Sequence, residues 1–214
     1  MIHAYDKLYL GGARTALGRM LDFAVYDLNY EISRFFDMFI STGVASGFEK
    51  GDVTLLAGKS GVELAYEVIE RIQGAVERIV PRYAGNRSAE YWTGWALAYY
   101  QWETSLSFAE IVNYVPIQEV QALYSPYHEM DIRQFVDKMN ELYREAKTGT
   151  NLSILRKRSS LSQRELSELS GVPLRTIQQY EQGRKNINKA QAEYLLRLSK
   201  VLYCEMHDLL EYVE

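Results

Sequence analysis

The chain has 214 residues and a mass of 24.7 kDa, enough for one large domain or two small ones. Hydrophobic residues make up 47% and charged residues 24% of it, a composition that excludes collagen, long disorder and low-complexity scaffolds. No run approaches the roughly 18 to 20 apolar residues of a membrane span, and no signal peptide is expected at the N-terminus. The lone Cys204 excludes a disulfide framework and a cysteine zinc cluster, so a cytoplasmic location is expected.

Charge is distributed unevenly along the chain, whose net charge is −4. Residues 1–147 carry 14 Lys/Arg and 20 Asp/Glu, a balance of −6, whereas residues 148–214 carry 10 and 8, a balance of +2. Within residues 151–200 the balance is 10 against 4, or +6. This asymmetry predicts an acidic domain over residues 1–147 and a basic domain over residues 148–214, with the small polar residues 147–150 at the boundary.

The first helices follow from apolar residues that recur every three or four positions, over residues 8–28 and 31–40. Residues 41–47 are mostly small and interrupt the helical pattern. Residues 53–56 are consistent with a short strand or an extended turn. Glycine and proline number only 14 and 4 in the whole chain, which favours long helices over many turns.

A capping box at Ser60 and Glu63 predicts the start of a helix that runs to about Ile72. The fragment Gly58-Lys59-Ser60 is also the ending of a phosphate-binding loop. That loop needs a glycine five positions before Gly58, where Val53 stands, so a turn glycine followed by a serine cap is the better interpretation. Residues 81–87 are expected to form a loop.

The most aromatic predicted helix covers residues 88–103. Its side chains Trp92, Trp95, Tyr99 and Trp102 fall within about 80° of one another at 100° per residue. Such a stripe suits an aromatic ligand or a nucleobase, but aromatic residues at helical spacing usually pack, so a core-facing stripe is expected. Residues 90–102 loosely resemble an unannotated domain that recurs in helix-turn-helix proteins of gut Firmicutes, and this resemblance implies no known chemistry.

Three further helices are predicted before the boundary, over residues 107–114, 116–123 and 131–146, the first opened by a second capping box at Ser107. No complete catalytic constellation is present. The histidines His3 and His128 are far apart and lack the spacing of metal ligands. We therefore expect no enzyme activity, no bound metal and no cofactor.

After residue 150 the pattern predicts two short helices joined by a tight turn. A third capping box at Ser162 and Glu165 opens the first helix, with Leu166 and Leu169 inside, and Gly171 ends it. Pro173 suits the first turn of the second helix, which would end at Gly183. This arrangement is a helix-turn-helix. Two more helices are expected to close the core, residues 189–202 and 206–210.

Residues 161–184 read LSQRELSELSGVPLRTIQQYEQGR and closely resemble the Cro/C1-type (xenobiotic-response-element) DNA-binding domain of phage repressors. The resemblance covers residues 150–211. It implies a five-helix, lambda-repressor-like domain. Because the N-terminal domain is also predicted to be helical, the fold class expected for the whole chain is all-α. The sequence departs from the family at Tyr203, where a turn glycine is usual.

The second helix of the motif predicts how DNA is read. Ile177 and Tyr180 share one face and would pack inward, while Arg175, Gln179 and Gln182 cluster on the opposite face. Arginine bonds bidentately to guanine and glutamine to adenine. The polar residues that follow the helix suit phosphate contacts: Arg184, Lys185, Asn188 and Lys189. The resemblance assigns Gln163 to the DNA backbone and the first base. The candidate DNA-binding residues are Gln163, Leu174, Arg175, Thr176, Gln178, Gln179, Gln182, Arg184, Lys185, Asn188 and Lys189.

A structural ion pair is expected between Arg156 and Glu181. The resemblance places an arginine of the first helix near a glutamate at the end of the recognition helix. Glu181 lies about 40° from Ile177 on the helical wheel, so it turns toward the core, where a carboxylate needs a cationic partner. The alternative is two independent surface charges.

These features predict a bacterial, nucleoid-associated transcriptional regulator that binds double-stranded DNA sequence-specifically and acts as a repressor. One recognition helix reads only a few base pairs, so a homodimer is expected, held by the N-terminal regulatory or dimerisation domain. The alternative is an antitoxin-like component whose N-terminal domain binds a protein partner.

Overall fold

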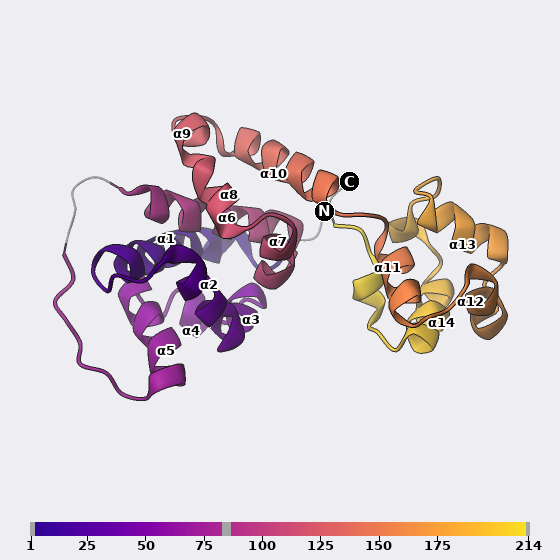
Figure 1. The fold of residues 1–214 in the computed structure, drawn as a ribbon, viewed down its shortest axis with the longest axis horizontal. Coiled ribbons are helices and arrows are strands. Elements are labelled where there is room, and N and C mark those ends of the chain that lie inside the picture. The colour runs from indigo at the N-terminus through magenta and orange to yellow at the C-terminus, as the bar shows by residue number, and fades with distance from the viewer. Residues whose placement is uncertain (1–2, 83–86, 213–214) are drawn as a thin grey trace. The chain divides into compact units, whose positions relative to one another are not determined.

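The computed structural model describes residues 3–82 and 87–212. The chain divides into two compact units, residues 1–146 and residues 147–214. All regular elements within the described residues are helices, which confirms the all-α prediction (Figure 1). None of these helices is long and apolar enough to cross a membrane. Part of the loop expected over residues 81–87 lies outside the described residues.

The N-terminal unit is built around α1, which packs along α6 and α5 (Figure 1). A Cβ atom at Gly94 of α6 would lie 2.5 Å from the carbonyl oxygen of Leu17 on α1, so the close crossing of these two helices requires a glycine there. The elements are η1 (Lys7–Tyr9), α1 (Leu10–Tyr26), α2 (Ile32–Ser41), α3 (Val44–Glu49), α4 (Val53–Leu56), α5 (Gly61–Gln73), α6 (Ala89–Thr104), α7 (Phe108–Tyr114), α8 (Ile117–Ala122), α9 (Tyr124–Tyr127) and α10 (Ile132–Ala146).

Two short helices of this unit correct the predictions made for residues 41–47 and 53–56. Helix α3 begins after Gly43, whose φ of 77° is left-handed, and it buries Val44, Ala45 and Phe48. Helix α4 begins after Asp52, whose carboxylate accepts a hydrogen bond from the Thr54 amide at 2.9 Å. Burial and a side-chain cap therefore stabilise helices that are too short to show a period.

The capping boxes of the N-terminal unit differ in completeness. At the start of α5, Ser60 and Glu63 bond reciprocally, which supports the serine-cap interpretation of the Gly58-Lys59-Ser60 fragment. At the start of α7 only half of the box forms. Ser107 accepts from the Glu110 amide at 3.1 Å, but the Glu110 carboxylate accepts from the Tyr143 hydroxyl at 2.6 Å. Packing against α10 thus competes with the local cap.

The aromatic stripe of α6 is only partly core-facing. Trp92 and Trp102 are buried, whereas Trp95 and Tyr99 remain half-buried. The helix is enclosed on its other faces as well, where Leu97 and similar residues are fully buried. The stripe is therefore the least buried side of a nearly buried helix, and the prediction of a core-facing stripe is wrong for two of its four members.

The C-terminal unit packs its helices around one small core. Its elements are α11 (Asn151–Arg158), α12 (Gln163–Ser170), α13 (Leu174–Glu181), η2 (Ile187–Lys189), α14 (Ala192–Leu202) and η3 (Met206–Leu209). Its buried apolar residues are Leu152, Leu166, Val172, Ile177, Tyr180, Ile187, Leu198, Leu202 and Leu209. Two predictions need correction, because α14 begins at Ala192 rather than at residue 189 and Leu169 is 64% exposed rather than inside.

Candidate nucleic-acid interface

The turn between α12 and α13 is fixed by local hydrogen bonds. Ser162 and Glu165 form a complete capping box at the start of α12. Gly171 ends the helix with a left-handed φ of 69°, and its amide donates to the Ser167 carbonyl at 2.9 Å. The Ser167 hydroxyl then donates to the Val172 carbonyl at 2.7 Å. These four hydrogen bonds, all within residues 162–172, set the direction in which α13 leaves the turn.

Helix α13 has one buried side and one accessible side. Ile177 and Tyr180 are 0% and 2% exposed, and they pack into the core of the unit. Arg175 and Gln182 are exposed on other faces of the helix. The remaining predicted reading residues of this helix are half-buried: Leu174, Thr176, Gln178 and Gln179. The accessible side therefore offers a guanidinium, amides, a hydroxyl and an apolar group, which are the groups that read base edges in a major groove.

The acidic residue of α13 is turned away from this accessible side. Arg156 Nε and Nη2 donate to the two carboxylate oxygens of Glu181 at 2.6 and 2.9 Å, so the pair is bidentate. Their side chains are 12% and 5% exposed. A third donation, from Arg156 Nη1 to the Leu161 carbonyl at 2.7 Å, fixes the guanidinium further. The expected structural ion pair is thus present in the geometry, and it removes a negative charge from the helix surface.

Glu181 also holds Gln163. The Gln163 side-chain amide donates to Glu181 Oε2 at 2.8 Å, which orients this side chain at the N-terminus of α12. Burial alone would raise the pKa of Glu181, but the hydrogen bonds from Arg156 and Gln163 outweigh it and hold that pKa below its usual value. The carboxylate therefore stays ionised at neutral pH. Sequence reasoning assigned Gln163 to DNA alone and missed this bond.

The polar residues that follow α13 fall into two groups. Arg184, Lys185 and Lys189 are exposed, and none of them forms an ion pair with a described residue. Lys185 Nζ lies 5.5 Å from the centre of the Tyr180 ring. These three side chains are free to meet phosphates.

Asn188, which was expected to contact phosphate, instead fastens the C-terminal segment. Its side-chain oxygen accepts from the Glu211 amide at 2.8 Å, and its side-chain nitrogen donates to the Glu211 carbonyl. The Glu211 carboxylate in turn accepts from Lys147 Nζ at 2.7 Å and from the Asn151 amide at 2.6 Å. The two ends of the unit are therefore joined through Glu211. No local sequence signal indicates a partner 23 residues away.

Both histidines of the N-terminal unit stack on aromatic rings. His3 stacks on Trp102, and His128 stacks on Tyr124. Among the described residues no group of three or more His, Cys, Asp or Glu side chains is placed to hold a metal ion.

Comparison with known protein families gives one match, to a family described as helix-turn-helix, over residues 152–209. The matched range starts at the second residue of α11 and ends at the last residue of η3, so it contains α12, the Gly171 turn and α13. No curated protein and no solved structure matches the chain significantly.

Proposed function

Because residues 152–209 form a Cro/C1-type helix-turn-helix domain, we propose that the protein is a sequence-specific transcriptional regulator that represses an operon by occupying its operator. The observation that carries this proposal is that α13 has one buried side and one accessible side. Its apolar residues Ile177 and Tyr180 are buried, while Arg175 is exposed on the helix and the Glu181 carboxylate is held inward. Such a helix can lie in the major groove without presenting a negative charge to phosphate.

In this proposal α13 contacts the bases, and the residues that follow it contact the phosphate backbone of the DNA. Arg175 bonds a guanine, and Gln179 or Gln182 an adenine. Arg184, Lys185 and Lys189 neutralise phosphates and set the register of the helix on the duplex. Gln163 contacts the backbone beside the first base while its amide remains tied to Glu181.

The protein acts as a homodimer in this proposal, because a single recognition helix reads too few base pairs to find one operator. Dimers of this class place two half-sites about one helical turn apart. Residues 1–147 supply the dimer contact and make the protein responsive to a signal. Light scattering of the full chain should give twice the 24.7 kDa of one chain, and a strictly monomeric protein at the concentration that binds DNA would contradict the dimer.

The experiment that tests the function is selection of genomic DNA fragments by the purified protein. We expect enrichment of fragments that share a short, twofold-related motif, and loss of that enrichment in Arg175→Ala. Arg164→Ala is the matched control, since Arg164 is an exposed arginine of α12 that pairs with Glu168. A reporter joined to the enriched promoter should rise when the gene is deleted. Enrichment without a shared motif would refute sequence-specific binding, and a falling reporter would refute repression.

The phosphate contacts can be tested separately, through the salt dependence of DNA binding. Lys185→Gln should weaken binding to all sequences alike and flatten the dependence of log K on log salt by about one unit. Lys200→Gln, at an exposed lysine of α14, should leave the slope unchanged. A Lys185→Gln loss confined to one base position would contradict a phosphate role.

A further inference from the structure

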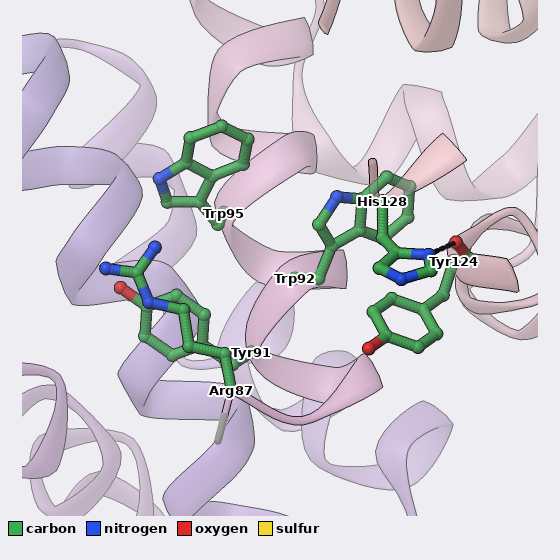
Figure 2. Close-up of a pocket in the computed structure, with 6 residues that line it drawn as sticks. All are labelled: Arg87, Tyr91, Trp92, Trp95, Tyr124 and His128. Atoms are coloured by element: carbon green, nitrogen blue, oxygen red, sulfur yellow. Dashed lines mark hydrogen bonds between the residues drawn. The ribbon is translucent and has the colours of Figure 1, made fainter. Parts of the chain in front are cut away.

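An aromatic cavity opens on the N-terminal unit beside the half-buried side of α6. It has a volume of about 260 Å³ and is lined by Arg87, Tyr91, Trp92, Trp95, Tyr124 and His128 (Figure 2). Tyr91 and Trp92 are buried, whereas Trp95 and Tyr124 are half-buried. Large aromatic surface that gathers in a concave site without being covered is typical of a place where a ligand binds.

The walls are suited to a flat ring. Figure 2 shows Trp92, Tyr124 and His128 on one side of the cavity and Arg87, Tyr91 and Trp95 on the other. The Trp92 and Tyr124 rings meet at 67° with centroids 5.7 Å apart, so one wall presents a ring face and a ring edge. His128 stacks on Tyr124 at 4.4 Å, and its Nδ1 lies 2.9 Å from the Tyr124 carbonyl oxygen. Aromatic pairs prefer such edge-to-face and offset-stacked arrangements, which an incoming ring can extend.

One guanidinium group, that of Arg87, lines the cavity, and a second, that of Arg14, lies over the ring of the lining residue Trp95 but itself lines a different cavity. The Arg87 guanidinium lies 5.0 Å from the centre of the Tyr91 ring at the exposed rim. The Arg14 guanidinium lies 3.2 Å from the centre of the Trp95 ring. Arg14 Nε and Nη2 are buried and have no hydrogen-bond partner among the described residues. Burial lowers the pKa of Arg14 to about 10, so this uncompensated group is still protonated at neutral pH.

No acidic residue is among the described residues that line the cavity. Glu90, the acid next to Tyr91 in the chain, is buried and accepts a hydrogen bond from Gln121 at 2.8 Å. Glu129 is not a lining residue, but its Oε1 lies 3.6 Å from His128 Nε2; its side chain is 87% exposed, so water screens its charge. The cavity thus combines apolar ring surface with the guanidinium of Arg87, which forms no ion pair with a described residue.

We propose that this cavity binds a small planar aromatic carboxylate. Its ring lies among Trp92, Trp95 and Tyr124, and its carboxylate pairs with the planar fork of Arg87, which suits bidentate bonding. A volume of about 260 Å³ is below the roughly 300–1,000 Å³ of ordinary ligand pockets, so it favours one or two rings. The proposal concerns residues 1–146 alone and does not depend on DNA binding by the other unit.

A cationic ligand is disfavoured in this cavity. Aromatic cages without cations attract ammonium groups through the ring faces, but here Arg14 and Arg87 already lie over two of those faces. A second cavity of the same unit provides a comparison. It is lined by Arg14 and Arg133 and also by the acid Glu103, so it serves as a reference site for the test.

The test uses the full chain and three ligands of similar shape: phenylacetate, phenylacetamide and 2-phenylethylammonium. Quenching of tryptophan fluorescence and calorimetry report binding. We expect phenylacetate to bind about tenfold more tightly than the amide, because a charge-assisted pair adds to ring stacking, and the ammonium to bind most weakly. Arg87→Gln should remove the preference for the carboxylate over the amide while the amide still binds.

Arg133→Gln is the matched control, and it should leave the carboxylate preference intact. Both arginines are exposed, so neither substitution should unfold the unit. The proposal is overturned by equal binding of the acid and the amide, by no binding of phenylacetate at millimolar concentration, or by preferred binding of the ammonium. It is also overturned if Arg133→Gln rather than Arg87→Gln removes the preference, because the ligand then occupies the second cavity.

Discussion

Two partly buried arginines, one in each unit, are held in different ways. In the C-terminal unit Arg156 bonds both carboxylate oxygens of Glu181, and its third nitrogen bonds a backbone carbonyl. In the N-terminal unit Arg14 lies against Trp95 and Tyr99, with two of its nitrogens buried and without a hydrogen-bond partner among the described residues. Both side chains lose water, but only Arg156 recovers hydrogen bonds in exchange.

The difference indicates what each charge does. A bidentate ion pair is directional, so it fixes α11 against the end of α13 and holds α13 in place. A guanidinium over aromatic rings is held less directionally. Its charge is not cancelled, so it remains available to an anion nearby. The first arrangement stabilises the fold of the C-terminal unit, whereas the second leaves a positive charge beside Trp95, one of the rings that line the aromatic cavity.

The largest expected effect comes from breaking the ion pair. Glu181→Ala leaves Arg156 buried and unpaired, and should cost about 3 kcal/mol of unfolding free energy. Chemical denaturation of residues 147–214 measures it. Glu193→Ala is the control, because Glu193 pairs with Arg197 on the surface, where such pairs contribute less than about 1 kcal/mol. A loss below about 1 kcal/mol for Glu181→Ala would mean that the pair does not hold α13.

The same pair should make stability depend on pH. The folded pKa of Glu181 lies below the ordinary value of 4.5, so its charge stabilises the folded unit above that pH. This stabilisation is lost as the pH falls through the lower folded pKa. We therefore expect the stability difference between the wild type and Glu181→Ala to shrink below about pH 4.5. Denaturation curves at several pH values check this, and a difference that does not change with pH would contradict it.

A smaller effect, of opposite sign, is expected at Tyr203. This residue ends α14 in the left-handed conformation, with φ of 52°, and is 96% exposed. Tyr203→Gly should raise the unfolding free energy by about 1 kcal/mol, because the strain of a side chain at positive φ is removed without loss of packing. Tyr203→Ala separates the two contributions, since it removes the ring and keeps Cβ. Equal stabilisation by alanine and glycine would show that backbone strain is not the cause.

The smallest effect is expected at Arg14. Arg14→Met should change the unfolding free energy by less than about 1 kcal/mol, because lost cation–π contact is offset by the burial of an uncharged side chain. Arg156→Met is the same substitution at the paired arginine. It should lower the unfolding free energy by about 3 kcal/mol, because it leaves the buried Glu181 carboxylate without its cationic partner. Thermal and chemical denaturation of the full chain compare the two variants. Similar losses at both positions would remove the distinction between the two arginines.

The sequence predicts the C-terminal unit well because its decisive signals are local. The Ser162 capping box and the left-handed Gly171 define the turn within ten residues, and Ile177 and Tyr180 give the buried side of α13. The sequence does not predict contacts between residues that are far apart along the chain. Asn188 has an ordinary phosphate-contact position after the recognition helix, and only the folded chain brings it to Glu211.

The N-terminal unit is harder to predict from its sequence. Helix α3 has six residues and depends on burial of Val44 and Phe48, so no period reveals it. Helix α4 does carry a local signal, the Asp52 cap, which the β-branched Val53 and Thr54 obscure. The half-burial of Trp95 follows from its neighbours on α1, above all Arg14, and helical spacing alone cannot indicate it.

The most direct test of the central claim is the base preference of Arg175→Ala measured against a library of operator variants. If α13 reads DNA, this variant should lose roughly 1 to 3 kcal/mol at the cognate site and accept any base at one position. Arg164→Ala should keep the full preference of the wild type. An unchanged preference in Arg175→Ala would contradict direct reading of bases by the exposed side of α13.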